Sequence, residues 1–175
     1  MKLRFAVLLL IISTLCSCVV KYANYVNPEG EGLATLNIKN VGTWYVTAIS
    51  FAEPNGCTGR TWLGPGVVDT GTDITIKLKP NEVFSFQSGS AKGSVGSGSG
   101  GLTSVIESCG GGSQRFIPRK NGRYEMVVGL ITEKNQCIYS FKEIIAGKET
   151  DIDSLMPNKV VIPQWANSPM CEKFE

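Results

Sequence analysis

The chain contains no histidine among its 175 residues. This absence excludes mechanisms that pair histidine with a serine or cysteine nucleophile, and it removes the commonest zinc ligand. A strong excess of one charge is lacking too, because 17 basic residues stand against 15 acidic ones. The net charge of +2 provides no basic surface for a nucleic-acid backbone. We therefore expect no nucleic-acid partner, no metal site and no cofactor.

The longest apolar run lies at the N-terminus, over residues 5–12, after Lys2 and Arg4. It is too short for a spanning helix, which needs about 20 apolar residues. A basic start, a short apolar run and small polar residues after it are typical of a secretory signal peptide. We predict that residues 1–17 are cleaved on export, which leaves 15 basic and 15 acidic side chains.

Residues 15–18 read Leu-Cys-Ser-Cys and resemble the lipobox of bacterial lipoproteins. The resemblance implies that Cys18 becomes the new N-terminus and carries acyl chains, palmitate among them, as a membrane anchor. Two or more chains hold a protein stably in a bilayer. Val19 in place of Asp after this cysteine implies sorting to the outer membrane, where the protein faces the periplasm or the cell surface. An ordinary signal peptide cut near Ser17 is the alternative.

Four further cysteines remain in the exported chain: Cys57, Cys109, Cys137 and Cys171. An even number in an exported domain predicts two disulfides. Three pairings are open, and we favour Cys57 with Cys109 and Cys137 with Cys171. No CxxC pair occurs, so a zinc site of four thiolates is the weaker interpretation.

Alternation of apolar and polar residues dominates the chain beyond the N-terminus and predicts an all-β protein. We expect residues 33–148 to form a single antiparallel β-sandwich of about seven strands. Turns at 40–43 and 133–136 would close two hairpins. The pattern resembles the small immunoglobulin-like or PEGA-like sandwiches of bacterial lipoproteins, a likeness of fold that implies no function. Expected strands lie at 34–39, 45–51, 74–79, 83–86, 124–130 and 137–141.

The segments outside these strands predict a less regular structure. Residues 18–32 read as a tether, able to hold the domain up to about 45 Å from the membrane. Residues 88–113 include 17 Gly or Ser among 26 and predict a long loop, with a short edge strand at 102–106. We expect residues 149–175 to pack on the domain as an irregular tail, held by Trp165 and a disulfide.

Residues 67–71, Val-Val-Asp-Thr-Gly, look like the active-site motif of aspartic proteases. The resemblance implies a homodimer in which two copies of Asp69 share a proton and activate a water. Residues 127–129 would supply the apolar-apolar-Gly segment beneath the aspartate. The alternative is a turn between two strands, since Asp and Gly are ordinary turn residues.

Two other patterns are weak. Gly96, Gly98 and Gly101 match the GxGxxG spacing of dinucleotide sites, but no helix follows, so we expect no nucleotide partner. Asp69 and Asp73 offer too few oxygens for calcium, which takes about six to eight.

Aromatic and basic residues suggest a binding surface. Trp62, between Gly59 and Gly64, is the best surface candidate for sugars, peptides or peptidoglycan, with Arg60 and Arg115 as donors to carboxylates. We place Trp44 or Tyr45 in the core instead.

The sequence therefore favours an outer-membrane lipoprotein with a non-catalytic binding or assembly role, as an accessory subunit or as an inhibitor or immunity factor. Its partners would be the membrane, reached through the N-terminal lipid, and a protein or cell-wall component of the envelope. The alternatives are the dimeric protease that uses Asp69 and a purely structural lipoprotein.

Overall fold

The computed structural model describes residues 23–98, 101–134, 136–161 and 168–174, and for residues 91–108 it describes the backbone alone. Within these residues the chain is β-structure with one 3-10 turn, η1 (Thr132–Lys134), so the predicted all-β class is confirmed. The strands are β1 (Ala23–Asn24), β2 (Ala34–Asn40), β3 (Val46–Glu53), β4 (Thr58–Val68), β5 (Asp73–Leu78), β6 (Phe84–Gly98), β7 (Gly101–Phe116), β8 (Arg123–Ile131), β9 (Gln136–Ile145), β10 (Lys148–Thr150) and β11 (Met156–Pro157).

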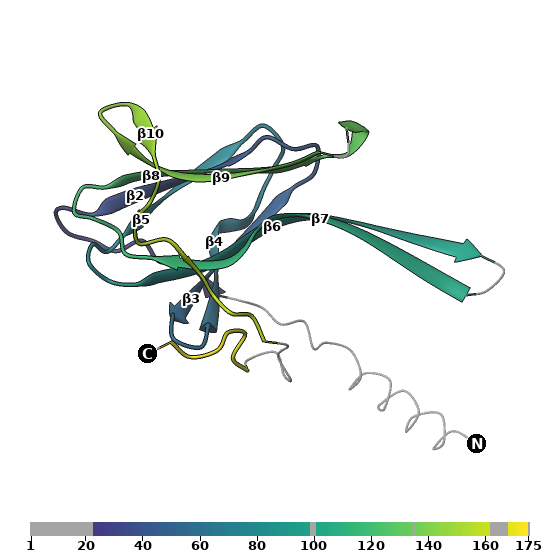
Figure 1. Cartoon of the computed structure of the whole chain (residues 1–175), viewed down its shortest axis with the longest axis horizontal. Helices are drawn as coiled ribbons and strands as arrows, with labels where there is room; N and C mark the ends of the chain where they lie inside the picture. Colours follow the sequence, from purple (N-terminus) through teal and green to yellow (C-terminus); the bar gives the residue numbers. More distant parts are fainter. Residues whose placement is uncertain (1–22, 99–100, 135, 162–167, 175) are drawn as a thin grey trace, which may run out of the picture.

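The strands form two sheets that pack face to face (Figure 1). Sheet A has the order β1-β4-β3-β6-β7-β11, and sheet B has the order β10-β9-β8-β2-β5. The predicted sandwich is confirmed, but the expectation of purely antiparallel sheets is wrong, because β1 runs parallel to β4 and β2 runs parallel to β8. The parallel pairs arise because β1 and β2 each pair with a strand distant in sequence, which leaves their direction free of a hairpin.

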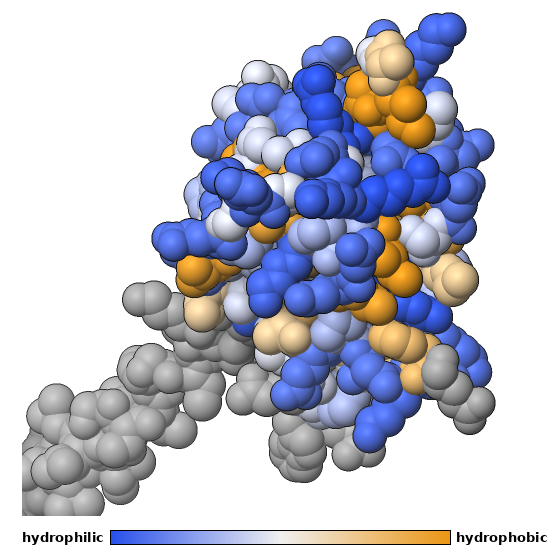
Figure 2. Space-filling view, turned by 90° about the vertical axis from the view of Figure 1, so that its left-hand side faces the viewer, coloured by the Kyte–Doolittle hydropathy of each residue, from blue (hydrophilic) through white to orange (hydrophobic). Residues whose placement is uncertain are grey.

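The core lies between the sheets and uses alternate residues of each strand. On β2 and its neighbour β8 the inward positions are buried. The positions between them carry polar side chains along β2, whereas on β8 they include the apolar Val127 and Ile131 as well as Arg123 and Glu125. Figure 2 shows the result on one face of the molecule, where polar residues cover most of the surface and apolar patches lie between them. The buried residues of these two strands include Leu36, Ile38, Met126 and Val128.

Aromatic rings from both sheets meet inside the sandwich. Phe86 of β6 and Phe116 of β7 contact Phe141 of β9, with ring centroids 5.2 Å and 5.0 Å apart. Phe116 also meets Tyr124 of β8 at 4.8 Å. Burial of each such ring contributes roughly 1.5–3 kcal/mol, so this cluster strongly stabilises the packing of the two sheets.

The predicted hairpin at residues 40–43 is wrong, because β2 belongs to sheet B and β3 to sheet A. The chain changes sheets at a corner organised by Asn40, which is 2% exposed. Its side-chain amide donates to the carbonyls of Val68 and Trp44, at 2.8 Å and 2.7 Å, and its Oδ1 accepts from the Gly42 amide at 2.9 Å. These bonds satisfy the carbonyls of Trp44 and Val68 and the amide of Gly42 where the chain passes from one sheet to the other.

β3, which follows this corner, directs Val46 and Ala48 to the core rather than the residues that the sequence analysis placed there. Val46 and Ala48 are fully buried, whereas Tyr45 is 47% exposed and Trp44 half-buried. The prediction that Trp44 or Tyr45 lies in the core is therefore wrong, since neither residue is buried. By contrast, the hairpin of β8 and β9 is confirmed, and its turn contains η1.

The predicted Gly/Ser loop at residues 88–113 is wrong, since β6 and β7 pair from Phe84 opposite Phe116 to Gly98 opposite Gly101. The expected edge strand at 102–106 is part of β7. A composition rich in Gly and Ser removes side-chain contacts but leaves the backbone free to pair, and the pairing continues outward past a register shift between Ser88 and Ser90. The outer halves, residues 91–98 and 101–108, project beyond the sandwich (Figure 1) and are called the arm below.

The N-terminal tether is shorter than predicted. β1 pairs with β4, and the Tyr25 amide donates to the Trp62 carbonyl at 2.7 Å. The Tyr25 hydroxyl donates to the Lys77 carbonyl at 2.8 Å, and its ring packs edge-on against Phe84. Residues 23–28 are therefore attached to the sandwich, because Tyr25 finds both an apolar site and hydrogen-bond partners there.

The C-terminal tail packs on the domain as predicted but is partly regular. β10 extends β9 in sheet B, and β11 pairs with β7 at the edge of sheet A. A further bridge joins Val160 to Cys171. Trp165, the other predicted attachment, lies outside the described residues.

Both predicted disulfides form, but the favoured pairing is wrong. Cys57 is bonded to Cys171, and Cys109 is bonded to Cys137. Cys109 of β7 is bonded to Cys137, the second residue of β9 in sheet B, so this disulfide joins the two sheets. Spacing along the sequence cannot select a pairing that depends on which strands face each other.

Candidate binding site on sheet A

A pocket of about 400 Å³ opens on the outer face of sheet A. Its wall comes from outward positions of β3, β4, β6 and β7, together with the buried Ser88, Ser90 and Cys109, and none of its lining residues is charged. Such a surface suits a neutral ligand, because a charged ligand would lack a partner of opposite sign. The lining includes Thr47, Ile49, Trp62, Gln87, Gly110 and Gly112.

Trp62 supplies the aromatic wall of this pocket. It lies opposite Ile49 in the ladder between β3 and β4. Gly66, with φ of 80°, lies against the indole, since a Cβ at this position would come within 2.7 Å of the ring. A glycine is required there because any side chain would displace the indole. The structure thus places the predicted surface candidate in a pocket, and its binding role stays a prediction.

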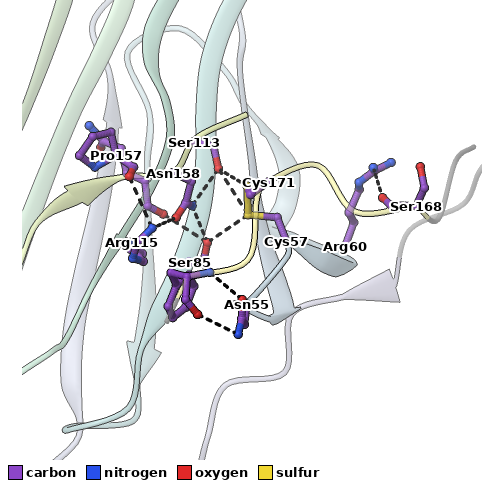
Figure 3. The surroundings of a disulfide bond; sticks show 12 residues. Asn55, Cys57, Arg60, Ser85, Ser113, Arg115, Pro157, Asn158, Ser168 and Cys171 are labelled. Atoms are coloured by element: carbon purple, nitrogen blue, oxygen red, sulfur yellow. Dashed lines mark hydrogen bonds between the residues drawn. A yellow bond between two sulfur atoms is a disulfide. The ribbon is translucent and has the colours of Figure 1, made fainter. Parts of the chain in front are cut away.

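The two predicted arginines do not join Trp62. Arg60 donates from Nη2 to the Ser168 carbonyl at 3.3 Å. Arg115 donates from Nη1 to Asn158 Oδ1 at 2.8 Å, and its guanidinium stacks 4.2 Å from the centre of the Phe174 ring. Figure 3 shows both arginines beside the C-terminal segment. Their interactions attach this segment to sheet A.

A buried polar cluster next to the Cys57–Cys171 disulfide was not predicted. Asn158, 5% exposed, donates from Nδ2 to the hydroxyls of Ser85 and Ser113, at 2.9 Å and 3.0 Å (Figure 3). These bonds satisfy groups that the tail removes from water, so the cluster is structural. No sequence signal distinguishes these two serines from the many others around them.

Asp69 lies on an exposed turn between β4 and β5. The Asp69 carbonyl accepts from the amide and the hydroxyl of Thr72, at 3.1 Å and 2.7 Å. This geometry matches the turn interpretation of the motif. Gly129, in the segment compared with the protease, packs against the backbone of Gly42 at the corner between the sheets.

A second pocket, of about 570 Å³, opens where the N-terminal segment crosses the end of the sandwich. Tyr25 and Phe84 form its apolar wall, and Lys79 and Glu82 contribute charges. Burial, with a further contribution from the charge of Glu82, raises the pKa of Tyr25 to about 12. An ordinary tyrosine is already neutral at physiological pH, so the raised pKa extends to higher pH the range in which Tyr25 keeps its hydroxyl proton.

Comparisons with protein-family models, curated proteins and solved structures found no match to this chain. Among the described residues no group of three His, Cys, Asp or Glu side chains is placed to hold a metal ion. In the same part of the chain no helix is long and apolar enough to cross a membrane.

Proposed function

We propose that this protein is an outer-membrane lipoprotein, anchored through Cys18, with a non-catalytic binding or assembly role in the cell envelope. The observation that carries the proposal is the Leu-Cys-Ser-Cys motif at residues 15–18, followed by a disulfide-linked sandwich. Disulfides persist in oxidising compartments outside the cytoplasm, which is the destination that the motif implies.

The position of β1 sets how close to the membrane the domain would lie. Five residue steps separate Cys18 from Ala23, the first residue of β1. A chain of this length spans at most about 18 Å. An anchored sandwich would therefore stay near the lipid surface, with the β1 edge of sheet A and the second pocket on the side of the anchor.

The pocket beside Trp62 supports the binding part of the proposal. An aromatic wall and uncharged polar groups suit a neutral ligand such as a glycan or an uncharged peptide segment of the cell wall. Arg60 and Arg115 are engaged by the C-terminal segment, so recognition would rest on Trp62 and its neighbours.

The direct test is the intact mass of membrane-extracted protein, with and without reduction, beside a Cys18→Ala variant. We expect a mass of residues 18–175 plus acyl chains, a gain of about 4 Da on reduction of the two disulfides, and a variant that leaves the membrane fraction. An unacylated, soluble wild-type protein would overturn the proposal.

The binding role needs a separate test, a sedimentation assay with purified peptidoglycan. Wild-type protein should co-sediment, and Trp62→Ala should reduce the bound fraction several-fold. Ile145→Ala, which removes an apolar side chain that is 48% exposed on β9 and lies outside the pocket, is the matched control. Equal loss in both variants would contradict a role for the pocket.

A further inference from the structure

The arm is the part of the fold whose backbone is paired least. β3 leaves β6 at the pair Val46–Ser90, and β11 pairs with β7 only at Gln114 and Arg115. Beyond these points residues 91–98 and 101–108 pair with each other and, among the described residues, with no third strand. Each half of the arm therefore has one open edge.

Such a ribbon has little to stabilise it alone. Of its 16 residues 8 are Gly or Ser, so it has little apolar surface to bury. Isolated two-stranded hairpins are at best marginally stable in water. Edge strands are usually protected by proline or by several charges, but residues 91–98 contain no proline and one charge, that of Lys92. These properties are those of a site for strand addition.

The edge of β6 is the better site of the two. Along the inner half of β6 this same edge pairs with β3. The open part of the edge starts beyond Ser90, which lies opposite Val46, the first residue of β3. Tyr45 lies at this point, 47% exposed, and its ring meets Trp44 edge-on with centroids 6.4 Å apart. The Ser90 hydroxyl donates to the Tyr45 carbonyl at 3.0 Å, which holds this aromatic pair beside the base of the arm. An added strand would end against an apolar contact.

We propose that the occupant of this edge is the same edge of a second copy of the chain, which pairs antiparallel about a two-fold axis to give a four-stranded ribbon. The two edges match in length by definition. The register places Lys92 opposite Glu107 within each arm, so the charges of the arm balance and two arms do not repel.

The pairing rule of antiparallel strands narrows the register. Alternate residues of a strand direct their N–H and C=O groups to the open edge, and each such residue must face a residue of the other strand that does the same. When the two strands are copies related by a two-fold axis, the numbers of two facing residues therefore differ by an even number. With the arms fully overlapped, either Ser94 or Val95 faces its own counterpart. Lys92 then faces Gly96 or Gly98 of the second copy, where no side chain obstructs it.

This inference rests on the proposed membrane anchor, because the anchor is what would make the dimer stable. Eight paired residues bury less than the roughly 1,200 Å² of a stable interface, so two free molecules would associate weakly. Anchors in one membrane raise the effective concentration and favour the dimer.

The test introduces a cysteine at the predicted axis of the full-length protein in its native membrane. Residues that face each other across an antiparallel pair have Cβ atoms about 4.5–5.5 Å apart, close enough for a disulfide after small adjustment. We expect Ser94→Cys or Val95→Cys to give a reducible dimer of twice the protomer mass after mild oxidation. Peptide mapping should show that Cys57–Cys171 and Cys109–Cys137 persist.

Matched controls come from the other edge of the same arm. Ser104 and Val105 lie opposite Val95 and Ser94, at the same distance from the sandwich. Their cysteine variants should give at least about tenfold less dimer than the better β6 variant, because their edge stays unpaired. Equal cross-linking at both edges, no dimer at either β6 position, or a product of another mass would overturn the proposal.

Failure of the anchor would be recognised separately. If wild-type protein proves unacylated, the same four variants are cross-linked as purified full-chain protein at high concentration. A dimer through β6 under these conditions would support the inference even though the proposed anchor had failed.

Discussion

β6 and β7 contain two different structures along their length. Their inner halves, residues 84–90 and 109–116, carry Phe86 and Phe116 into the core, with 0% and 1% of their surface exposed. Their outer halves form the arm, where the two strands pair with each other but, among the described residues, with no third strand. The difference teaches that side-chain packing gives this hairpin its stability at one end, while free backbone edges make it available for assembly at the other.

The largest effect should come from the disulfide that closes the longest loop. Cys57 and Cys171 are 114 residues apart, so replacing both by serine should lower the free energy of unfolding by about 5 kcal/mol. The C-terminal segment would lose its covalent attachment beside the inner hairpin. Chemical denaturation measures this loss.

Serine replacement of Cys109 and Cys137, only 28 residues apart, is the matched control and should cost about 3.5 kcal/mol. Equal losses from the two pairs would contradict an effect that depends on loop length.

The second-largest loss of unfolding free energy should come from removing an aromatic ring of the inner halves of β6 and β7. Phe116→Ala removes contacts with Tyr124 and Phe141 and leaves a cavity, which should cost about 3–5 kcal/mol. Phe116→Leu, which keeps most of the volume, should cost clearly less in the same urea titration. If the two variants were equally stable, packing of this ring would not stabilise the inner hairpin.

Local alternation made part of this fold predictable. The inward residues of β2 and β8 and the hairpin of β8 and β9 could be read from period two, because these strands have one buried face. The corner at Asn40 could not, since its turn-like residues do not show that the Asn40 side chain is buried and bonds the carbonyls of Trp44 and Val68. The arm was not predictable because its backbone pairing continues from the inner halves, past a register shift between Ser88 and Ser90, rather than following from its own composition.

The candidate site was predictable to a lesser degree. Trp62 was recognised as a surface aromatic between glycines, and it does line a pocket. The tail that engages Arg60 and Arg115 could not be foreseen, because its path depends on the pairing of Cys171 with Cys57. Whether a charged side chain is exposed depends on which segment packs against it, and here that segment is distant in the sequence.

A smaller effect is expected at Tyr139, which lies between the sheets near the base of the arm. Its hydroxyl donates to Gln114 Oε1, and burial raises its pKa to about 12. The unfolded chain releases this proton near pH 10. The wild type should therefore lose stability as the pH rises from about 10 to about 12, because only the unfolded state ionises readily there.

Tyr139→Phe should cost about 1 kcal/mol at pH 8, through the lost hydrogen bond. This deficit should shrink above pH 10, as measured by thermal unfolding across a pH series. Tyr25, whose pKa is also raised to about 12, remains in both proteins and serves as an internal background. A deficit that stayed constant up to pH 12 would contradict this explanation.

The smallest effect should come from removing the arm. Replacement of residues 91–108 by Asn-Gly, a sequence suited to a two-residue hairpin turn, should change the free energy of unfolding by less than about 0.5 kcal/mol. Both disulfides should still form, and the dimer should be lost. A loss of stability as large as that of Phe116→Ala would show that the arm belongs to the folded body.

Hydrogen exchange resolved along β6 and β7 tests the central comparison most directly. We expect residues 84–90 and 109–116 to be protected in every sample, because their amides open only with the sandwich. Amides of residues 91–98 should be protected in the membrane-anchored protein and exchange rapidly in dilute Cys18→Ala protein, where the second copy is absent. Strong protection of the arm in the dilute soluble variant would contradict the account, since the ribbon would then be stable without a partner.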